Sequence, residues 1–423
     1  MPATDSPSPA AAAPLASIGR SIRSLRRDHN QIHSIPTPHA ADPDLDAADA
    51  FQRRAADLLA DLLADGAPDL LSLPWTTRLL DAFLLCLEEF RALLFGPGAA
   101  AAARPPLDRL VADFFDRAVK ALDLCNAVRD GLDLVRQWRK HLAIAAAVLA
   151  AAAPDPATAP PLGEAQIRRA RKALTDLTIL MLDDRDGGGG GVVGQRNRSF
   201  GRAAKDARPQ GHGQGHHRRS SSGGSSGSGS GSAHLRSLSW SVSRAWSAGR
   251  QLQAIGGGLP VPRPHDITAT GGLASAVYTM GAVLFVVAFA LVAAIPCQDR
   301  GLQAHFSVPR NFPWSGAATA LYDRILEESK KKDRKNSCGL LKEIHHIELC
   351  SRHLMDITDT SEFPLPEDKD ADVQEAAQEL VQLCKSLKDG LDPLERQVRE
   401  MFHRIVRTRT EILDCLSKPH GTE

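Results

Sequence analysis

The segment GAVLFVVAFALVAAI, residues 281–295, carries no polar side chain, and no Asp, Glu, Lys, Arg or His lies between Asp266 and Asp299. The apolar run from Leu273 to Pro296 has roughly the twenty residues that a helix needs to cross about 30 Å of hydrocarbon. Apolar helices rich in Ala and Gly also occur at the centre of large bundles, so a fully buried helix is the alternative. We expect residues 267–298 to form one apolar, membrane-inserted helix.

The charged residues on either side of this segment bear on its orientation in a membrane. Basic residues are concentrated on its N-terminal side, which the positive-inside rule would leave in the cytosol, but Arg300, Arg310 and residues 330–332 follow on the other side. A single-pass and a peripheral insertion, each with the bulk of the chain facing the cytosol, both fit these flanks. A cytosolic pool is compatible with either arrangement. Residues 1–27 lack the apolar run of a cleaved secretion signal.

The composition favours an all-α fold. Hydrophobic residues make up 43% of the chain, which is ample for burial, while aromatic residues make up only 5% and the periodic stretches are rich in Ala, Leu, Arg, Asp and Glu. A chain of 423 residues exceeds what one core normally organises, so two helical regions are expected. The cysteines number seven, an odd count, and are scattered at apolar positions, which indicates buried thiols in a reducing compartment.

Residues 46–184 predict an N-terminal helical bundle region, preceded by a disordered tail over residues 1–45. Apolar residues recur there at three- and four-residue steps in four stretches, with breaks at Gly66, at residues 96–98 and at residues 105–106. The longest of the four predicted stripes has heptad-like spacing and consists of Leu107, Val111, Phe114, Ala118, Ala121, Cys125, Val128, Leu132, Val135 and Leu142.

Residues 299–423 predict a C-terminal helical region. Its last segment holds heptad spacing, typical of a long packing helix or a coiled coil, from Val373 to Ile412. Gly390 and Pro393 fall inside this segment, where we expect a kink. The apolar face of such a helix more commonly packs within the chain, here against the N-terminal bundle. Pairing with a helix of a partner protein is the alternative.

Residues 185–266 predict a basic, Gly/Ser-rich, disordered linker, because they contain little to bury. The residues from Arg185 to Arg263 include twelve Lys and Arg but only two Asp, which gives this segment a net charge of about +10. The excess favours contact with anionic lipid or an acidic partner, although a solvated loop would explain it as well. Nucleic acid is disfavoured because no recognition motif accompanies the charge. Trp240 and Trp246 are candidates for docking the linker on the bundle or for lying at a membrane interface, with docking preferred.

Three serines in this linker follow closely after arginines in backbone that we expect to be accessible. Ser220, Ser239 and Ser247 are therefore candidates for phosphorylation, which would cancel local positive charge. Arg/Ser-rich sequence also produces such tripeptides by chance.

The sequence offers no candidate for a catalytic site. The glycine run 187–191 lacks the Gly-Lys-Ser/Thr ending of a phosphate-binding loop, and no carboxylate pair is placed for acid/base catalysis. His346, Cys350 and His353 share a helical face at zinc-compatible spacing, but no fourth ligand is evident. We therefore expect no enzyme activity, no metal, no cofactor and no small-molecule substrate.

Six stretches, in order along the chain, resemble the BYPASS-related/ROH family of plant proteins. They are residues 105–111 (PPLDRLV), 116–125 (DRAVKALDLC), 168–174 (RRARKAL), 239–247 (SWSVSRAWS), 294–298 (AIPCQ) and 401–407 (MFHRIVR). The resemblance covers about residues 75–416. It implies no function for the N-terminal tail or for the Gly-rich linker.

This resemblance implies a helical, non-enzymatic protein linked to growth, signalling and secretion. It also implies binding to the seventy-kilodalton subunit of the exocyst tethering complex. No contact residues carry over from the family. We expect a membrane-associated adaptor or regulator of secretion, and the alternative is a lipid-binding scaffold that acts through the basic linker without exocyst contact.

Overall fold

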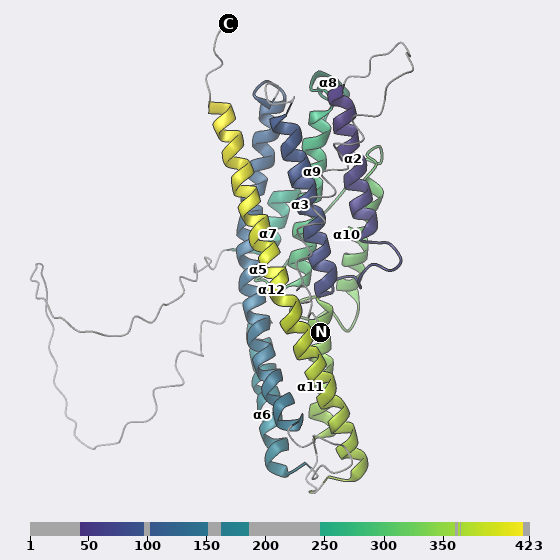
Figure 1. Ribbon diagram of the computed structural model, residues 1–423, viewed down its shortest axis with the longest axis vertical. Coiled ribbons are helices and arrows are strands. Elements are labelled where there is room, and N and C mark those ends of the chain that lie inside the picture. Colours follow the sequence, from purple (N-terminus) through teal and green to yellow (C-terminus); the bar gives the residue numbers. More distant parts are fainter. Residues whose placement is uncertain are drawn as a thin grey trace, which may run out of the picture. The chain divides into compact units, whose positions relative to one another are not determined.

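The computed structural model describes residues 43–96, 102–150, 162–185, 246–359, 363 and 365–417. These residues form helices and loops and contain no strand, so the all-α prediction is confirmed (Figure 1). The predicted tail and most of the Gly/Ser-rich linker lie outside them. The helices are α2 (Pro43–Asp61), α3 (Leu73–Phe95), α5 (Leu107–Ala150), α6 (Glu164–Arg185), α7 (Ala248–Gly256), α8 (Pro264–Ala269), α9 (Leu273–Ala294), α10 (Ser315–Lys330), α11 (Lys342–Ile357) and α12 (Glu367–Ser417).

The apolar segment forms α9, and every one of its 22 residues is buried by protein. Helices α3, α5, α7, α8 and α10 pack around it. Aromatic side chains complete the enclosure: the Phe285 ring stacks on Phe306 with centroids 4.9 Å apart, and Phe289 lies 4.7 Å from the Tyr322 ring. The structure gives α9 the enclosure expected of a buried central helix, and membrane insertion stays a prediction. The length and composition of α9 would also suit a helix that crosses a bilayer, and for this reason the sequence predicted a membrane-inserted helix.

Thr279, a buried polar residue of α9, finds its hydrogen-bond partners within the protein. Thr279 donates its hydroxyl proton to the Ser275 carbonyl at 2.8 Å and accepts the indole N–H of Trp314 at 2.9 Å. At the C-terminal end, where helix carbonyls lack intrahelical donors, the N–H groups of Leu340 and Leu341 donate to the carbonyls of residues 293 and 294. The helix end is therefore capped by protein rather than left for solvent or lipid headgroups.

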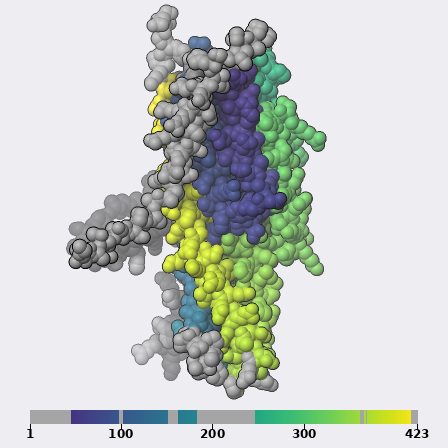
Figure 2. Space-filling model, turned by 45° about the vertical axis from the view of Figure 1, so that its right-hand side comes forward, coloured from purple at the N-terminus to yellow at the C-terminus, as the bar shows by residue number. Residues whose placement is uncertain are grey.

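The longest helices, α5 and α12, pack along each other, and α6 and α11 flank them (Figure 1). Helix α3 also packs on α12, so residues from the predicted N-terminal region 46–184 and C-terminal region 299–423 share one core. The described helices from α2 to α12 accordingly belong to one compact unit. Figure 2 shows the purple segment that includes α2 and α3 between the yellow α12 and the green helices.

One sequence prediction about elements is corrected, and another stays a prediction. Helix α12 continues through Gly390 and Pro393, and the kink expected at these residues stays a prediction. The predicted linker 185–266 is too long, because residues from Trp246 onward belong to the fold and form α7 and α8. Leu252 and Ile255 of α7 are fully buried, so this segment does have apolar surface to bury.

Candidate functional site

The groove between α6 and α11 is the largest cavity among the pockets described, about 590 Å³ in volume. Helices α6 and α11 run antiparallel, and one end of the pair is fixed by Arg171. Its guanidinium donates to the Met355 carbonyl and to the Asp359 carboxylate, each at 3.1 Å. Beyond this bridge the helices make few contacts, and the groove opens between the C-terminal half of α6 and residues 345–355 of α11.

The walls of the groove combine apolar side chains with a charged rim. Leu182 is 47% exposed and Leu349 is 45% exposed, an unusual state for leucines that share a concave surface. Two methionines lie beside them, and Met side chains adapt to varied partner shapes. The apolar members are Met181, Leu182, Leu349 and Met355, and the charged members are Lys332, Asp333, Glu348 and Arg352.

The floor of the groove holds a histidine with a perturbed environment. Burial lowers the pKa of His345, and the neighbouring Arg334 guanidinium lowers it further. The Nε2 atom lies 3.4 Å from the Asp333 carboxylate, while Nδ1 is buried without a hydrogen-bond partner among the described residues. Both effects favour the neutral imidazole, and in that form the contact with Asp333 is not an ion pair.

The Ser337, His345 and Asp333 side chains all line this groove, but they are not arranged as a catalytic triad. The Ser337 hydroxyl is hydrogen-bonded to the Glu348 carboxylate at 3.0 Å rather than to the imidazole. A serine nucleophile needs its base within hydrogen-bond reach. The geometry suits binding of another surface better than nucleophilic catalysis.

Five residues of the predicted linker were named as candidates. Trp246 and Ser247 lie within the described part of the chain, and Trp240, Ser220 and Ser239 lie outside it. Trp246 is half-buried and packs on the core, beside a pocket of about 310 Å³ that Gly131 and Pro296 also line.

Ser247 is not the accessible residue that the sequence predicted, because it is only 5% exposed. Its hydroxyl caps α7 by accepting the Arg250 N–H at 3.3 Å, and it donates to the Asp299 carbonyl at 3.3 Å. A phosphate has no room at a buried cap, so the folded chain does not offer Ser247 for phosphorylation.

The chain that follows α9 lies against the start of α7 at this cap. The Ala248 N–H donates to the Gln298 carbonyl at 3.2 Å, and the Gly249 N–H donates to the Asp299 carbonyl at 3.0 Å. Ser247 and Gln298, the last residues of two stretches that resemble the ROH family, therefore lie at one junction.

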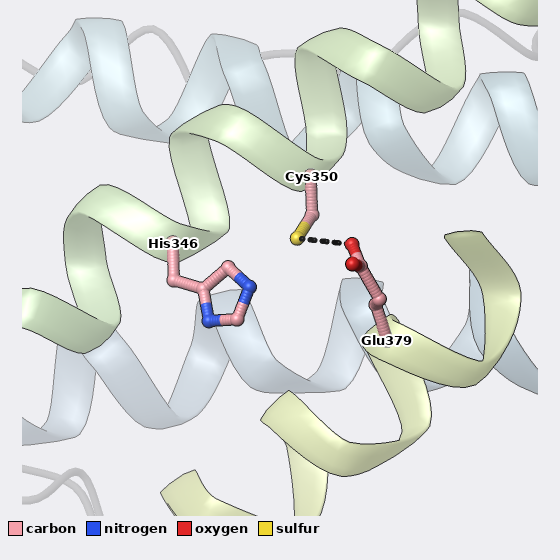
Figure 3. Close-up of side chains that lie close together, drawn as sticks. All are labelled: His346, Cys350 and Glu379. Carbon is pink, nitrogen blue, oxygen red and sulfur yellow. Dashed lines mark hydrogen bonds between the residues drawn. The ribbon is translucent and has the colours of Figure 1, made fainter. Parts of the chain in front are cut away.

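A second polar cluster lies where α11 packs on α12. His346 and Cys350 of α11 and Glu379 of α12 bring their potential ligand atoms within 4.8 Å of one another (Figure 3). Burial, followed by the charge of the adjacent Glu379, raises the pKa of the Cys350 thiol to about 12. His353, the third member expected from the sequence, is exposed and is not part of the cluster.

A family model described as Protein ROH1-like matches residues 10–416. The chain belongs to the ROH1-like family. Protein ROH1D of Arabidopsis thaliana is 50% identical over 412 residues, which cover 96% of this chain and 98% of that protein. Protein ROH1A of the same plant is 35% identical over 398 residues, or 87% of this chain and 89% of that protein. No solved structure matches the chain.

The sequence did not predict the groove of this ROH1-like chain. Its walls come from α6, α11 and the loop between α10 and α11, and α6 is far from the other two in the sequence. One signal was present: Leu182 and Leu349 fall off the buried stripes of their helices. Apolar residues off the stripe are the pattern that an exposed docking face produces.

Proposed function

We propose that this ROH1-like chain is a non-enzymatic adaptor whose α6–α11 groove receives an apolar helix face of a partner. The observation that carries the proposal is the pair of half-exposed leucines, Leu182 and Leu349, on facing walls of the groove. Recognition of an amphipathic helix uses such a groove, with apolar anchors in the centre and charges at the rim. The partner that the family resemblance suggests is the seventy-kilodalton subunit of the exocyst.

Because α9 is enclosed by protein, this function does not require a spanning helix. We propose that the chain associates with the membrane peripherally, with its helical unit in the cytosol. Proximity to a membrane would raise the effective concentration of the adaptor near vesicle-tethering machinery.

The binding test compares purified full-length protein with a variant carrying Leu182→Asp and Leu349→Asp. Covering the exposed half of each leucine should contribute about 1 kcal/mol, so we expect the double variant to lose roughly thirtyfold in affinity for the exocyst subunit in titration calorimetry. Val261→Asp is the matched control, because Val261 is 50% exposed but lies outside the groove. Equal affinity of the double variant and the wild type would refute the groove assignment.

A second candidate function is lipid binding through the basic linker, favoured by the net charge of about +10 between Arg185 and Arg263. Its signature is binding to anionic vesicles that weakens as salt increases. Vesicle binding that persists in the groove variant, together with no binding of the exocyst subunit by the wild type, would favour this scaffold over the adaptor.

A further inference from the structure

His346, Cys350 and Glu379 present three different ligand types from two helices. His346 and Cys350 are one turn apart on α11, so they project on the same side, and Glu379 reaches across from α12 (Figure 3). The Cys350 thiol donates a hydrogen bond to the Glu379 carboxylate across 3.6 Å. Within the described residues, Glu379 forms no ion pair, so its negative charge lacks a cationic partner.

We propose that His346, Cys350 and Glu379 form a binding site for one zinc ion. A set of imidazole, thiolate and carboxylate ligands suits Zn²⁺, which accepts nitrogen, sulfur and oxygen donors. Magnesium and calcium prefer oxygen donors and would leave the sulfur unused. The ligand chemistry therefore selects zinc over the abundant hard cations.

The ligand atoms need only a small movement to bind the ion. Zinc bonds of about 2.0–2.3 Å in a tetrahedral arrangement place the ligand atoms roughly 3.5 Å apart. The observed separations reach 4.8 Å at most, and both His346 and Glu379 are exposed side chains that can rotate toward the buried Cys350. Rotamer changes can close the gap without moving either helix.

The charges balance when the ion binds. Cys350 releases its proton to solvent and binds as a thiolate, Glu379 binds as a carboxylate, and His346 binds as a neutral imidazole. The two anionic ligands then neutralise the divalent ion. The fourth coordination position is left for a water molecule, because three protein ligands are at hand.

Such an ion would tie α11 to α12. Helix α11 also forms one wall of the groove, and its His345 and Leu349 are sequence neighbours of the zinc ligands. The inference does not rest on the adaptor function, since the ligand geometry stands whether or not a partner enters the groove.

The test uses full-length protein that has been stripped with a chelator and then titrated with zinc alone. We expect one zinc ion per chain by elemental analysis, with affinity measured against a chromophoric chelator. Cobalt in place of zinc should give the near-ultraviolet absorption of a thiolate–cobalt bond. His346→Gln and Cys350→Ser should each lower the affinity roughly a hundredfold or more, since even loss of an outer-shell partner costs about 10–100-fold.

His353→Gln and Cys384→Ser are the controls, because both residues lie outside the cluster, and both should bind zinc as the wild type does. His346 is exposed, so His346→Gln tests the site even if Cys350→Ser disturbs folding. Absence of stoichiometric zinc in the wild type, a cobalt complex without the thiolate band, or equal affinity of His346→Gln and the wild type would overturn the proposal.

Discussion

Gly131 marks the closest approach of α5 to the end of α9. A Cβ atom at this position would lie 2.2 Å from the Pro296 carbonyl oxygen and 2.6 Å from Cγ2 of Ile295. Such an overlap forces the backbone to shift, so Gly131→Ala should lower the free energy of unfolding by about 1–3 kcal/mol. Urea denaturation followed by circular dichroism measures the free energy of unfolding of the variant and the wild type. Gly316→Ala is the control: its Cβ would meet nothing within 4 Å, so it should be neutral or slightly stabilising. Equal effects of the two substitutions would contradict the close approach.

His345 predicts a pH dependence of stability. Its pKa is lowered from 6.5 in the fold, first by burial and then by Arg334; Arg352 and His346 act in the same direction and Asp333 opposes them. Below pH 6.5 the unfolded chain therefore binds a proton more readily than the folded chain. The contribution of His345 to stability is present above pH 6.5 and is lost as the pH falls through the folded pKa.

His345→Gln should flatten the change in stability between about pH 7 and pH 5, because the titrating group is gone. Unfolding free energies of the variant and the wild type across this range measure the effect. Parallel curves would show that other groups cause the pH dependence.

The candidate zinc site was half visible at the residue scale. The i, i+4 spacing of His346 and Cys350 indicated one helical face, but the sequence offered His353 beside them and predicted no metal there. The third ligand, Glu379, lies 29 residues beyond Cys350 on another helix. Only the packing of α11 on α12 brings it near, and no spacing rule along one helix contains that information.

At the scale of the elements, heptad spacing predicted the long helices α5 and α12 because their buried stripes follow the helical period. Helix α12 continues through Gly390, and packing gives this glycine a role. Gly390 lies against Leu73, and a Cβ atom there would come within 2.8 Å of the Leu73 side chain. The absence of a side chain at Gly390 therefore lets α12 lie close to the start of α3. One helix thus passes through a glycine and a proline that, considered locally, favour a break.

Arg136 ties α5 to α12. Its guanidinium lies 2.8 Å from Asp133 on its own helix, and 2.9 Å and 2.6 Å from Asp392 and Glu395 on α12. The side chain is 21% exposed, so solvent screens the network only in part. Arg136→Ala should cost about 1–2 kcal/mol of unfolding free energy, with a smaller loss at high salt.

Arg399→Ala is the matched control for Arg136→Ala. Arg399 contacts Glu395 within α12 alone, and its side chain is 53% exposed. Its loss should be within about 0.5 kcal/mol, the range for an exposed pair one helical turn apart. Chemical denaturation at low and high salt compares the two variants. A loss for Arg399→Ala as large as that for Arg136→Ala would contradict the bridging role of Arg136.

At the scale of the whole molecule, the sequence identified α9 as a long apolar helix but not its surroundings. Protein and hydrocarbon bury apolar side chains alike, so composition cannot distinguish them. The distinction depends on contacts from five other helices and on donors at positions 340 and 341 that cap the helix end. In the same way, the groove depends on three segments that meet only in the folded unit.

The enclosure of α9 decides whether this ROH1-like chain works as a cytosolic helical unit or through a spanning helix. Hydrogen–deuterium exchange on the full-length chain in detergent-free buffer tests it most directly. We predict that the chain stays in solution and that amides of Leu273–Ala294 exchange among the slowest in the protein, because the helix lies at the centre of the cooperative core. A chain that requires detergent, with α9 protected only after transfer to lipid, would contradict the account.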